Sequence, residues 1–124
     1  MRKKRILIVD DDVAAVKLLM LNIESMGGYE VFTESKGSYA VAAARECRPD
    51  LVIMDIMMPD MLGSDAAAAL HDDSVLGPID VVFITAMLKK GEERKFGKGA
   101  GVQAIFAKPI NKVDLVEIFE QAFG

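Results

Sequence analysis

The sequence predicts a three-layer α/β fold, in which a parallel sheet lies between two layers of helices. One observation is the apolar run 51–54, which leads straight into Asp55 and is soon followed by Pro59. A short apolar run between such breakers is typical of a strand that is buried on both faces. A second observation is that segments with helical spacing alternate with such runs along the chain. This alternation favours a parallel sheet that helices cover on both sides.

The first two strands and helices follow each other closely. Residues 5–10, with the apolar run 6–9 at their centre, predict a buried strand, and apolar residues recur at helical spacing over 13–26. A pair of glycines ends this first helix. The run 29–33 is partly polar, so we expect a second strand nearer an edge of the sheet. The Ala-rich segment 38–46 predicts a helix that stops before Pro49, because the residue before a proline disfavours helical geometry.

The rest of the chain repeats the alternation. We expect further strands at 51–54, 79–84 and 102–107, and further helices at 64–71, 91–99 and 111–123. Three glycines dilute the helix at 91–99, and glycine has a low helix propensity. The last helix opens with Asn111 and Asp114 at the spacing of a capping box. The elements therefore form five consecutive strand–helix units, (βα)5.

The order of the strands follows from general rules of topology. Crossovers between parallel strands are right-handed, which leaves few arrangements. For five units we expect a parallel five-stranded sheet in the flavodoxin-like order 2-1-3-4-5, with its switch point between strands 1 and 3. Ligands of such sheets bind at the carboxyl ends of strands beside that point. A length of 124 residues without linker or internal repeat predicts a single domain over residues 1–124.

Composition narrows the classes of function. Hydrophobic residues make up 52% of the chain, which is typical of a folded globular protein. A net charge of −4 without a basic stripe argues against nucleic-acid binding. No apolar run reaches membrane-spanning length, and the run after the basic start is too short for a signal peptide. Cys47 is the only cysteine, so we expect no internal disulfide and a cytoplasmic location.

Chemically active side chains stand where the predicted strands end. The aspartates 10–12 end the first strand, Asp55 the third, Thr85 the fourth and Lys108 the fifth. Strands 1 and 3 are neighbours in the predicted order, so their carboxylates converge and repel each other. A divalent cation removes this conflict, and oxygen ligands without His or Cys favour Mg²⁺. Asp12 precedes a helix, which makes it a helix N-cap rather than a ligand.

A nucleophilic carboxylate, a Mg²⁺ site, a hydroxyl and a lysine are together the parts that phosphoryl transfer needs. Asp55 would attack phosphorus and form an acyl phosphate. Asp11, and Asp10 through water, would hold the metal. Thr85 and Lys108 would each hold one phosphoryl oxygen.

The whole chain resembles the receiver domain of two-component response regulators. The matching pieces are residues 6–11, residues 55–59 with Gly63, the pair 85–86 and the pair 108–109. The resemblance implies that the acidic pair Asp10–Asp11 binds Mg²⁺, and that the backbone carbonyl of Met57 joins it. It also implies that Asp55 accepts a phosphoryl group from the phosphohistidine of a histidine kinase or phosphotransfer protein. The Lys108–Pro109 peptide is usually cis in that family, and a peptide bond before proline can be cis at a small cost in free energy.

The resemblance also predicts how such a domain works. It is a phosphoacceptor switch that assists its own phosphorylation and dephosphorylation, not an enzyme with a separate substrate. Its output face comprises helix 4, strand 5 and helix 5, and binds a downstream protein. The polar stretch 89–101 is expected to change conformation at low cost. The sequence leaves the cognate kinase, the output partner and a possible homodimer open.

Two departures from the family pattern bear on function. Ile105 stands where the family commonly has Tyr or Phe, and Phe106 points to the opposite face because strand side chains alternate. We therefore expect Thr85 to move while the aromatic relay is absent or muted. Met57 and Met87 occupy the positions that help control water access in the family, and neither can orient an attacking water. This predicts a slowly hydrolysing phospho-Asp55.

Two other functions remain as alternatives. A receiver-like binding scaffold would keep the fold without using its phosphate site. A phosphatase of the haloacid-dehalogenase type would use 10–12 as its Asp-x-Asp, with Thr85 and Lys108 in the right order. That family needs a further acidic pair at a strand end, whereas Asp114 lies in a predicted helix, and Asp55 would have no role.

Overall fold

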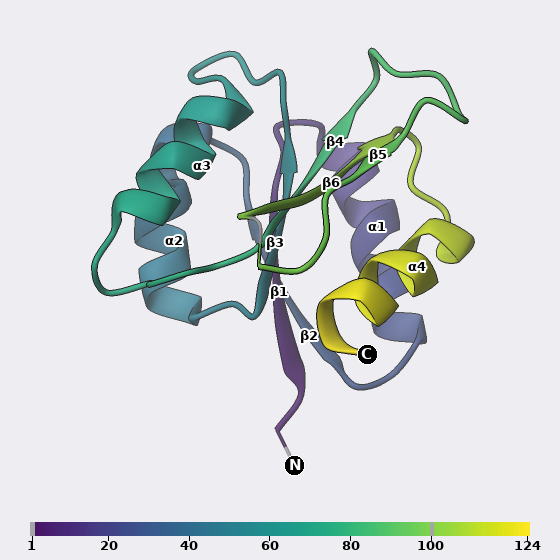
Figure 1. Ribbon diagram of the computed structural model, residues 1–124, viewed down its shortest axis with the longest axis horizontal. Helices are drawn as coiled ribbons and strands as arrows, with labels where there is room; N and C mark the ends of the chain where they lie inside the picture. Colours follow the sequence, from purple (N-terminus) through teal and green to yellow (C-terminus); the bar gives the residue numbers. More distant parts are fainter. Residues whose placement is uncertain (1, 100) are drawn as a thin grey trace.

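The computed structural model describes residues 2–99 and 101–124, which form a six-stranded sheet with helices on both faces (Figure 1). The strands are β1 (Lys4–Val9), β2 (Tyr29–Glu34), β3 (Leu51–Asp55), β4 (Val81–Thr85), β5 (Arg94–Lys95) and β6 (Val102–Ala107). The helices are α1 (Val13–Ser25), the 3-10 turn η1 (Gly37–Tyr39), α2 (Ala40–Cys47), α3 (Gly63–Asp72) and α4 (Lys112–Phe123). The predicted three-layer α/β fold is confirmed.

The sheet has the order β2-β1-β3-β4-β6-β5. All neighbours from β2 to β6 pair in parallel, and β6 is the strand predicted as the fifth. The expected order 2-1-3-4-5 is therefore confirmed for the parallel strands. This order places the carboxyl ends of β1 and β3 side by side, with Val9 opposite Met54.

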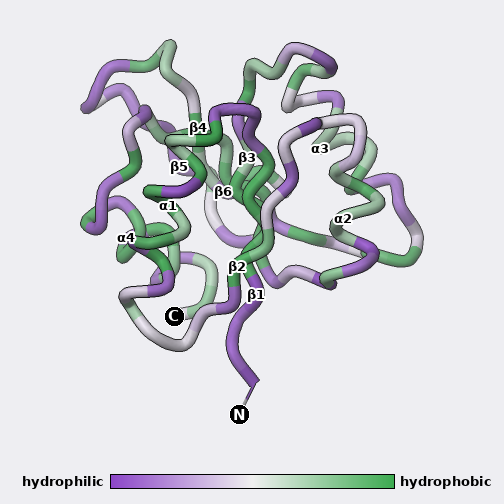
Figure 2. The backbone as a smooth tube through the Cα atoms, turned by 180° about the vertical axis from the view of Figure 1, so that it is seen from behind, coloured by the Kyte–Doolittle hydropathy of each residue, from purple (hydrophilic) through white to green (hydrophobic). Residues whose placement is uncertain are grey.

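Alternation along the central strands divides the core into two layers. Ile6 and Ile8 of β1 pack in the cluster that α1 and α4 cover, whereas Leu7 and Val9 pack in the cluster that α2 and α3 cover. Figure 1 shows these two pairs of helices on opposite sides of the sheet. Figure 2 shows hydrophobic residues concentrated along the central strands. No helix of the described residues is long and apolar enough to cross a membrane.

Both predicted helix caps are present. Asp12 caps α1, and its side chain accepts a hydrogen bond of 3.1 Å from the Ala15 amide. Asn111 and Asp114 form a reciprocal capping box at the start of α4, with hydrogen bonds of 2.8 and 3.1 Å. These caps fix where the loops after β1 and β6 become helices.

The prediction of a helix over 91–99 is wrong, and the sheet is neither five-stranded nor entirely parallel. The stretch contains turns and the short strand β5, which pairs antiparallel with β6. Gly91 and Gly97 have φ values of 98° and 100°, which a right-handed helix excludes. The Phe96 amide donates instead to the carbonyl of Gln103 at 2.8 Å. The described residues between β4 and β6 therefore contain no helix, so the face expected for output would consist of the 86–101 segment, β6 and α4.

Candidate functional site

The candidate site lies at the carboxyl ends of four strands, where the sequence placed it. Asp10 directly follows β1, Asp55 ends β3, Thr85 ends β4 and Lys108 directly follows β6. The exposed fractions of Asp10, Asp55 and Thr85 are only 3%, 6% and 4%. The Lys108 ammonium lies 2.7 Å from Asp10 Oδ2 and 3.5 Å from Asp55 Oδ1. Parallel pairing of the strands thus brings a partly buried cation between two buried carboxylates.

Three carboxylates of the site are close enough to share one metal ion. Asp10, Asp11 and Asp55 each offer an oxygen, and these oxygens lie within 4.8 Å of one another. Asp11 is exposed, whereas the other two are buried, so the cluster is open to solvent on one side. Oxygen donors alone suit a hard divalent cation such as Mg²⁺. The loop that carries Met57 begins directly after Asp55 and is pinned by a bridge to Leu62.

The electrostatics of the site oppose ionisation of Asp55. Burial raises the pKa of Asp55, and the charge of Asp10 raises it further. The Lys108 charge and a hydrogen bond from the Met57 backbone offset only part of this rise. For Lys108, burial lowers the pKa, but the hydrogen bond and charge of Asp10 outweigh burial, so the pKa is raised. The pKa shift of Lys108 thus favours its positively charged form, and a further cation beside Asp55 would favour the ionised form of that carboxyl.

Gly63 lets α3 begin directly against the end of β3. A Cβ atom at this position would lie 2.4 Å from the Asp55 carbonyl oxygen, closer than any side chain can come. The Gly63 amide donates to the Ile56 carbonyl at 2.7 Å. The glycine in the matched motif is thus needed for a close approach of backbones beside Asp55.

Asp60 contributes to the loop after β3, and the sequence analysis assigned it no role. Its carboxylate accepts hydrogen bonds from the Ser38 hydroxyl at 2.6 Å and the Ser38 amide at 3.0 Å. The Gly37 amide donates to it as well, at 3.2 Å. The Ser38 hydroxyl is the main cause of the lowered pKa of Asp60. No sequence signal links residues so far apart, although a carboxylate after proline is typical of turns.

Thr85 contacts its own loop rather than the carboxylates. Its hydroxyl oxygen accepts a hydrogen bond from the Met87 amide at 3.1 Å. Its carbonyl accepts a hydrogen bond from the Lys108 amide at 2.9 Å, which ties β4 to the loop after β6. The Lys108–Pro109 peptide is cis, as the resemblance to receiver domains implied.

The positions that depart from the family pattern lie as expected. Ile105 packs on the side of α2 and α3, whereas Phe106 is 1% exposed and packs on the side of α1 and α4. Phe106 therefore cannot replace the missing aromatic ring on the other face. Met57 and Met87 are 54% and 77% exposed at the rim of the site, where neither offers a hydrogen-bond donor to water.

Comparison with known proteins agrees with this geometry. The family model of the response regulator receiver domain matches residues 6–120. The chain is 36% identical over 121 residues to the polar-differentiation response regulator DivK of Brucella anthropi, covering 98% of this chain and 97% of that protein. The chain belongs to the response regulator receiver domain family.

Solved structures show the same arrangement of the backbone. Chemotaxis response regulator CheY4 of Vibrio cholerae has a TM-score of 0.78 and 26% identity, covering 98% of this chain and 99% of that one. The receiver domain from the hybrid histidine kinase CckA has a TM-score of 0.73 and 29% identity, covering 97% of this chain and 99% of that one. The fold is the flavodoxin-like α/β fold of CheY-like proteins.

Proposed function

We propose that this chain is a phosphorylation switch in which Asp55 accepts a phosphoryl group in a Mg²⁺-dependent reaction. The donor is the phosphohistidine of a histidine kinase or of a phosphotransfer protein. The observation that carries the proposal is the convergence of Asp10, Asp11 and Asp55 around the Lys108 ammonium. Nothing else among the described residues groups acidic side chains at metal-binding distance.

Each residue of the cluster has a distinct part in the reaction. Asp10, Asp11 and Asp55, with the backbone carbonyl of Met57, would hold the Mg²⁺. When bound, the ion neutralises charge on the carboxylates and on the phosphoryl oxygens. Asp55 is only 6% exposed, so few water molecules would compete with the donor for its carboxylate.

The transfer itself exchanges one bond for another. An Asp55 carboxylate oxygen attacks phosphorus, and the bond from phosphorus to the donor's imidazole nitrogen breaks. The imidazole keeps the electron pair and takes up a proton, while Asp55 becomes an acyl phosphate. The Lys108 ammonium and the Thr85 hydroxyl then bind phosphoryl oxygens. Lys108 already lies beside Asp55, so only a short shift from Asp10 is needed.

Output begins with the same two residues. When the Thr85 hydroxyl turns to the phosphoryl group, the hydrogen bond from the Met87 amide is lost. This change reaches the 86–101 segment, which with β6 and α4 forms the face for a downstream protein partner. The aromatic relay is absent, because Ile105 has no ring. We place this switch in the cytoplasm, where its kinase partner would reach it.

The experiment that tests the proposal is intact-mass measurement after incubation with Mg²⁺ and acetyl phosphate. We expect the wild type to gain a single phosphoryl group, and the gain to disappear with EDTA or in Asp55→Asn. Asp60→Asn is the matched control, because Asp60 follows the same strand but binds Ser38 instead of the cluster. Its mass gain should equal that of the wild type.

Two results would contradict the proposal. A protein that binds Mg²⁺ but gains no mass from acetyl phosphate or from a phosphorylated kinase is a receiver-like scaffold. Continuous turnover of a phosphate ester would instead indicate a phosphatase. Asp114, a candidate for the second acidic group of a phosphatase, is held in the capping box of α4 and bound to Lys90.

A further inference from the structure

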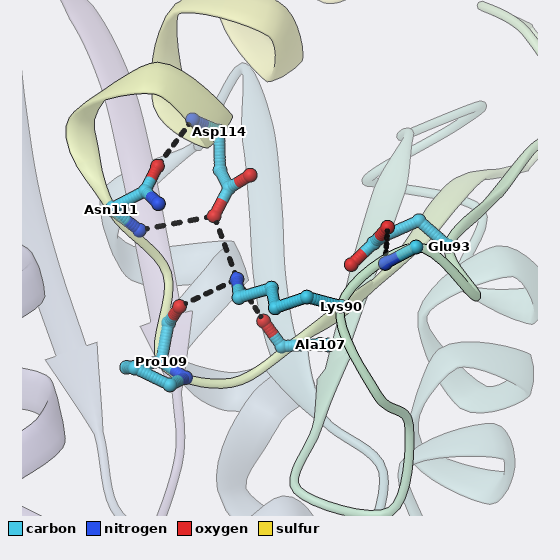
Figure 3. A network of polar contacts seen from close by, with 7 residues as sticks. Lys90, Glu93, Ala107, Pro109, Asn111 and Asp114 are labelled. Carbon is cyan, nitrogen blue, oxygen red and sulfur yellow. Dashed lines mark hydrogen bonds and ion pairs between the residues drawn. The ribbon is translucent and has the colours of Figure 1, made fainter.

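Lys90 reaches from the turn after β4 across to the loop between β6 and α4 (Figure 3). Its ammonium donates hydrogen bonds to the Ala107 carbonyl at 2.8 Å and to the Pro109 carbonyl at 2.7 Å. It also donates to Asp114 Oδ2 at 3.0 Å. An ammonium group has three N–H donors, so each of them has an acceptor between the end of β6 and the first turn of α4.

The two carbonyls belong to the residues directly before and after Lys108. One cation therefore holds the backbone on both sides of the lysine whose own ammonium lies between Asp10 and Asp55. No other side chain of the described residues donates to either carbonyl.

The third acceptor ties the same point to the start of α4. Asp114 Oδ2 accepts from the Asn111 amide at 3.1 Å as well as from Lys90. The Lys90 side chain is 45% exposed, so its ion pair with Asp114 alone would contribute little. The contact gains its strength from the two carbonyls, because bonds from a charged donor are short and strong.

The turn that carries Lys90 is shaped by local contacts. Gly91 donates its amide to Glu93 Oε1 at 2.8 Å, and Lys89 donates its amide to Glu92 Oε1 at 2.7 Å. Lys89 is exposed, and its side chain has no hydrogen bond or ion pair among the described residues. Two consecutive lysines thus differ completely in what they bind.

We propose that Lys90 is a positioning residue for phosphoryl transfer, which holds the backbone of Lys108 so that its ammonium is aimed at the phosphoryl site. The inference rests on the proposed function. Lys90 touches neither a carboxylate of the metal cluster nor the path of the phosphoryl group. It acts only through Lys108. Because Lys90 belongs to the 86–101 segment, a shift of Lys108 on phosphorylation would also move that segment.

The experiment compares three variants in acetyl phosphate reactions at saturating Mg²⁺. Lys90→Met removes the donors at similar length, Lys90→Arg restores donors, and Lys89→Met removes the neighbouring charge. We expect the rate of phospho-Asp55 formation at saturating acetyl phosphate to fall about tenfold in Lys90→Met, because small displacements of a catalytic group are costly. The rate should return to within about threefold in Lys90→Arg and stay at the wild-type value in Lys89→Met.

Hydrogen exchange of the Lys108 amide gives a second readout that needs no phosphorylation. This amide donates to the Thr85 carbonyl at 2.9 Å, so its exchange reports how firmly the loop is held. Lys90→Met should exchange it about tenfold faster, while amides of β1 and β3 keep their wild-type rates. Faster exchange throughout the sheet would mean a general loss of stability and would overturn the positioning role.

Failure of this inference and failure of the proposed function give different results. A wild type that takes no phosphoryl group overturns both. A wild type that is phosphorylated, with Lys90→Met reacting at the same rate, overturns only the role of Lys90. If Lys90→Met loses rate and Lys90→Arg does not restore it, hydrogen exchange of the Lys108 amide shows whether the loop around Lys108 has loosened. Wild-type protection of that amide would overturn the inference.

Discussion

Two stretches leave the same edge of the sheet and are held in opposite ways. The loop 56–62 after β3 is fixed at both ends, by the close approach of Gly63 to the Asp55 carbonyl and by the bonds of Asp60 to η1. The described residues of the 86–101 segment after β4 are mostly exposed, and regular structure among them is limited to the two residues of β5. Asp55, the proposed nucleophile, thus stands beside the stretch with more contacts, and the surface that would respond lies in the more exposed one.

The difference suggests how a small domain combines two demands. Transfer to Asp55 requires a carboxylate held to within a fraction of an ångström, whereas signalling requires a surface with two conformations of similar free energy. The two stretches follow the adjacent strands β3 and β4. Thr85 and Lys108 therefore lie where they could contact a phosphoryl group on Asp55 and also shift the 86–101 segment. Variants in the loop 56–62 and in the 86–101 segment should therefore differ in their effects on stability and on phosphorylation.

The largest expected effect concerns aromatic residues in β6 and beside β5. Phe106 is 1% exposed, so Phe106→Ala should lower the free energy of unfolding by about 3–5 kcal/mol. Phe96 is 55% exposed, and Phe96→Ala should change it by less than about 0.5 kcal/mol. Urea unfolding of both variants measures the contrast. Equal losses would mean that the 86–101 segment is as firmly packed as the sheet.

The second prediction compares glycines in the two stretches. Gly63→Ala should destabilise the protein by about 1–3 kcal/mol and displace Asp55, because the new methyl group meets backbone atoms. Gly97 has a φ of +100° with open space around it, so Gly97→Ala should cost about 1 kcal/mol through backbone strain alone. Phosphorylation by acetyl phosphate should slow at least about tenfold in Gly63→Ala and stay within about twofold in Gly97→Ala. Similar rates for the two variants would contradict a rigid loop at Asp55.

The third prediction concerns the exposed methionines, one from each stretch. Met57→Asn combined with Met87→Glu introduces groups that can orient water, so phospho-Asp55 should decay about tenfold faster, or ~1.4 kcal/mol in activation free energy. Leu62→Asn is the control, because Leu62 is 46% exposed in the same loop but lies outside these two positions. Decay is followed by intact mass after removal of acetyl phosphate. An unchanged lifetime in the double variant would refute the assignment of slow hydrolysis to the methionines.

The rigid stretch and its strands could be predicted from sequence because their signals are local. The apolar run that ends in Asp55 sets both the strand and the position of the carboxylate at its end. Topology rules then bring the ends of β1 and β3 together, and the capping box of Asn111 and Asp114 sets the start of α4. Within the run at Asp55 and within the capping box, the residues that matter lie within a few positions of one another, and the topology rules need only the order of these local elements.

The 86–101 segment could not be predicted in the same way. Its conformation depends on pairing with β6 and on glycines with positive φ, and neither leaves a clear periodic pattern. The position of Lys90 depends on carbonyls that lie 17 and 19 residues further along the chain. Asp60 likewise binds residues 22 and 23 positions away. Polar contacts between distant loops carry no sequence signal that a single chain reveals.

The smallest expected effect is the loss of folding stability that ionised Asp55 causes when no metal is bound. Burial and the Asp10 charge raise the pKa of Asp55, so the folded protein binds a proton more readily than the unfolded chain does. The free energy of unfolding should therefore fall as pH rises from the ordinary Asp range through the raised pKa of Asp55. Asp55→Asn should remove this fall and be more stable than wild type at neutral pH in EDTA, as measured by urea unfolding. Asp60→Asn should lower the free energy of unfolding at neutral pH. The Ser38 hydroxyl lowers the pKa of Asp60, so the ionised carboxylate stabilises the folded protein above the ordinary Asp range, and this stabilisation is lost as pH falls. Mg²⁺ should reduce the advantage of Asp55→Asn, since the ion stabilises only a folded cluster that retains all three carboxylates. If the free energy of unfolding of the wild type stays constant or rises over this pH range, the Lys108 charge is enough to offset the burial of Asp55 and its repulsion by Asp10. Ionised Asp55 would then cost the folded protein no stability.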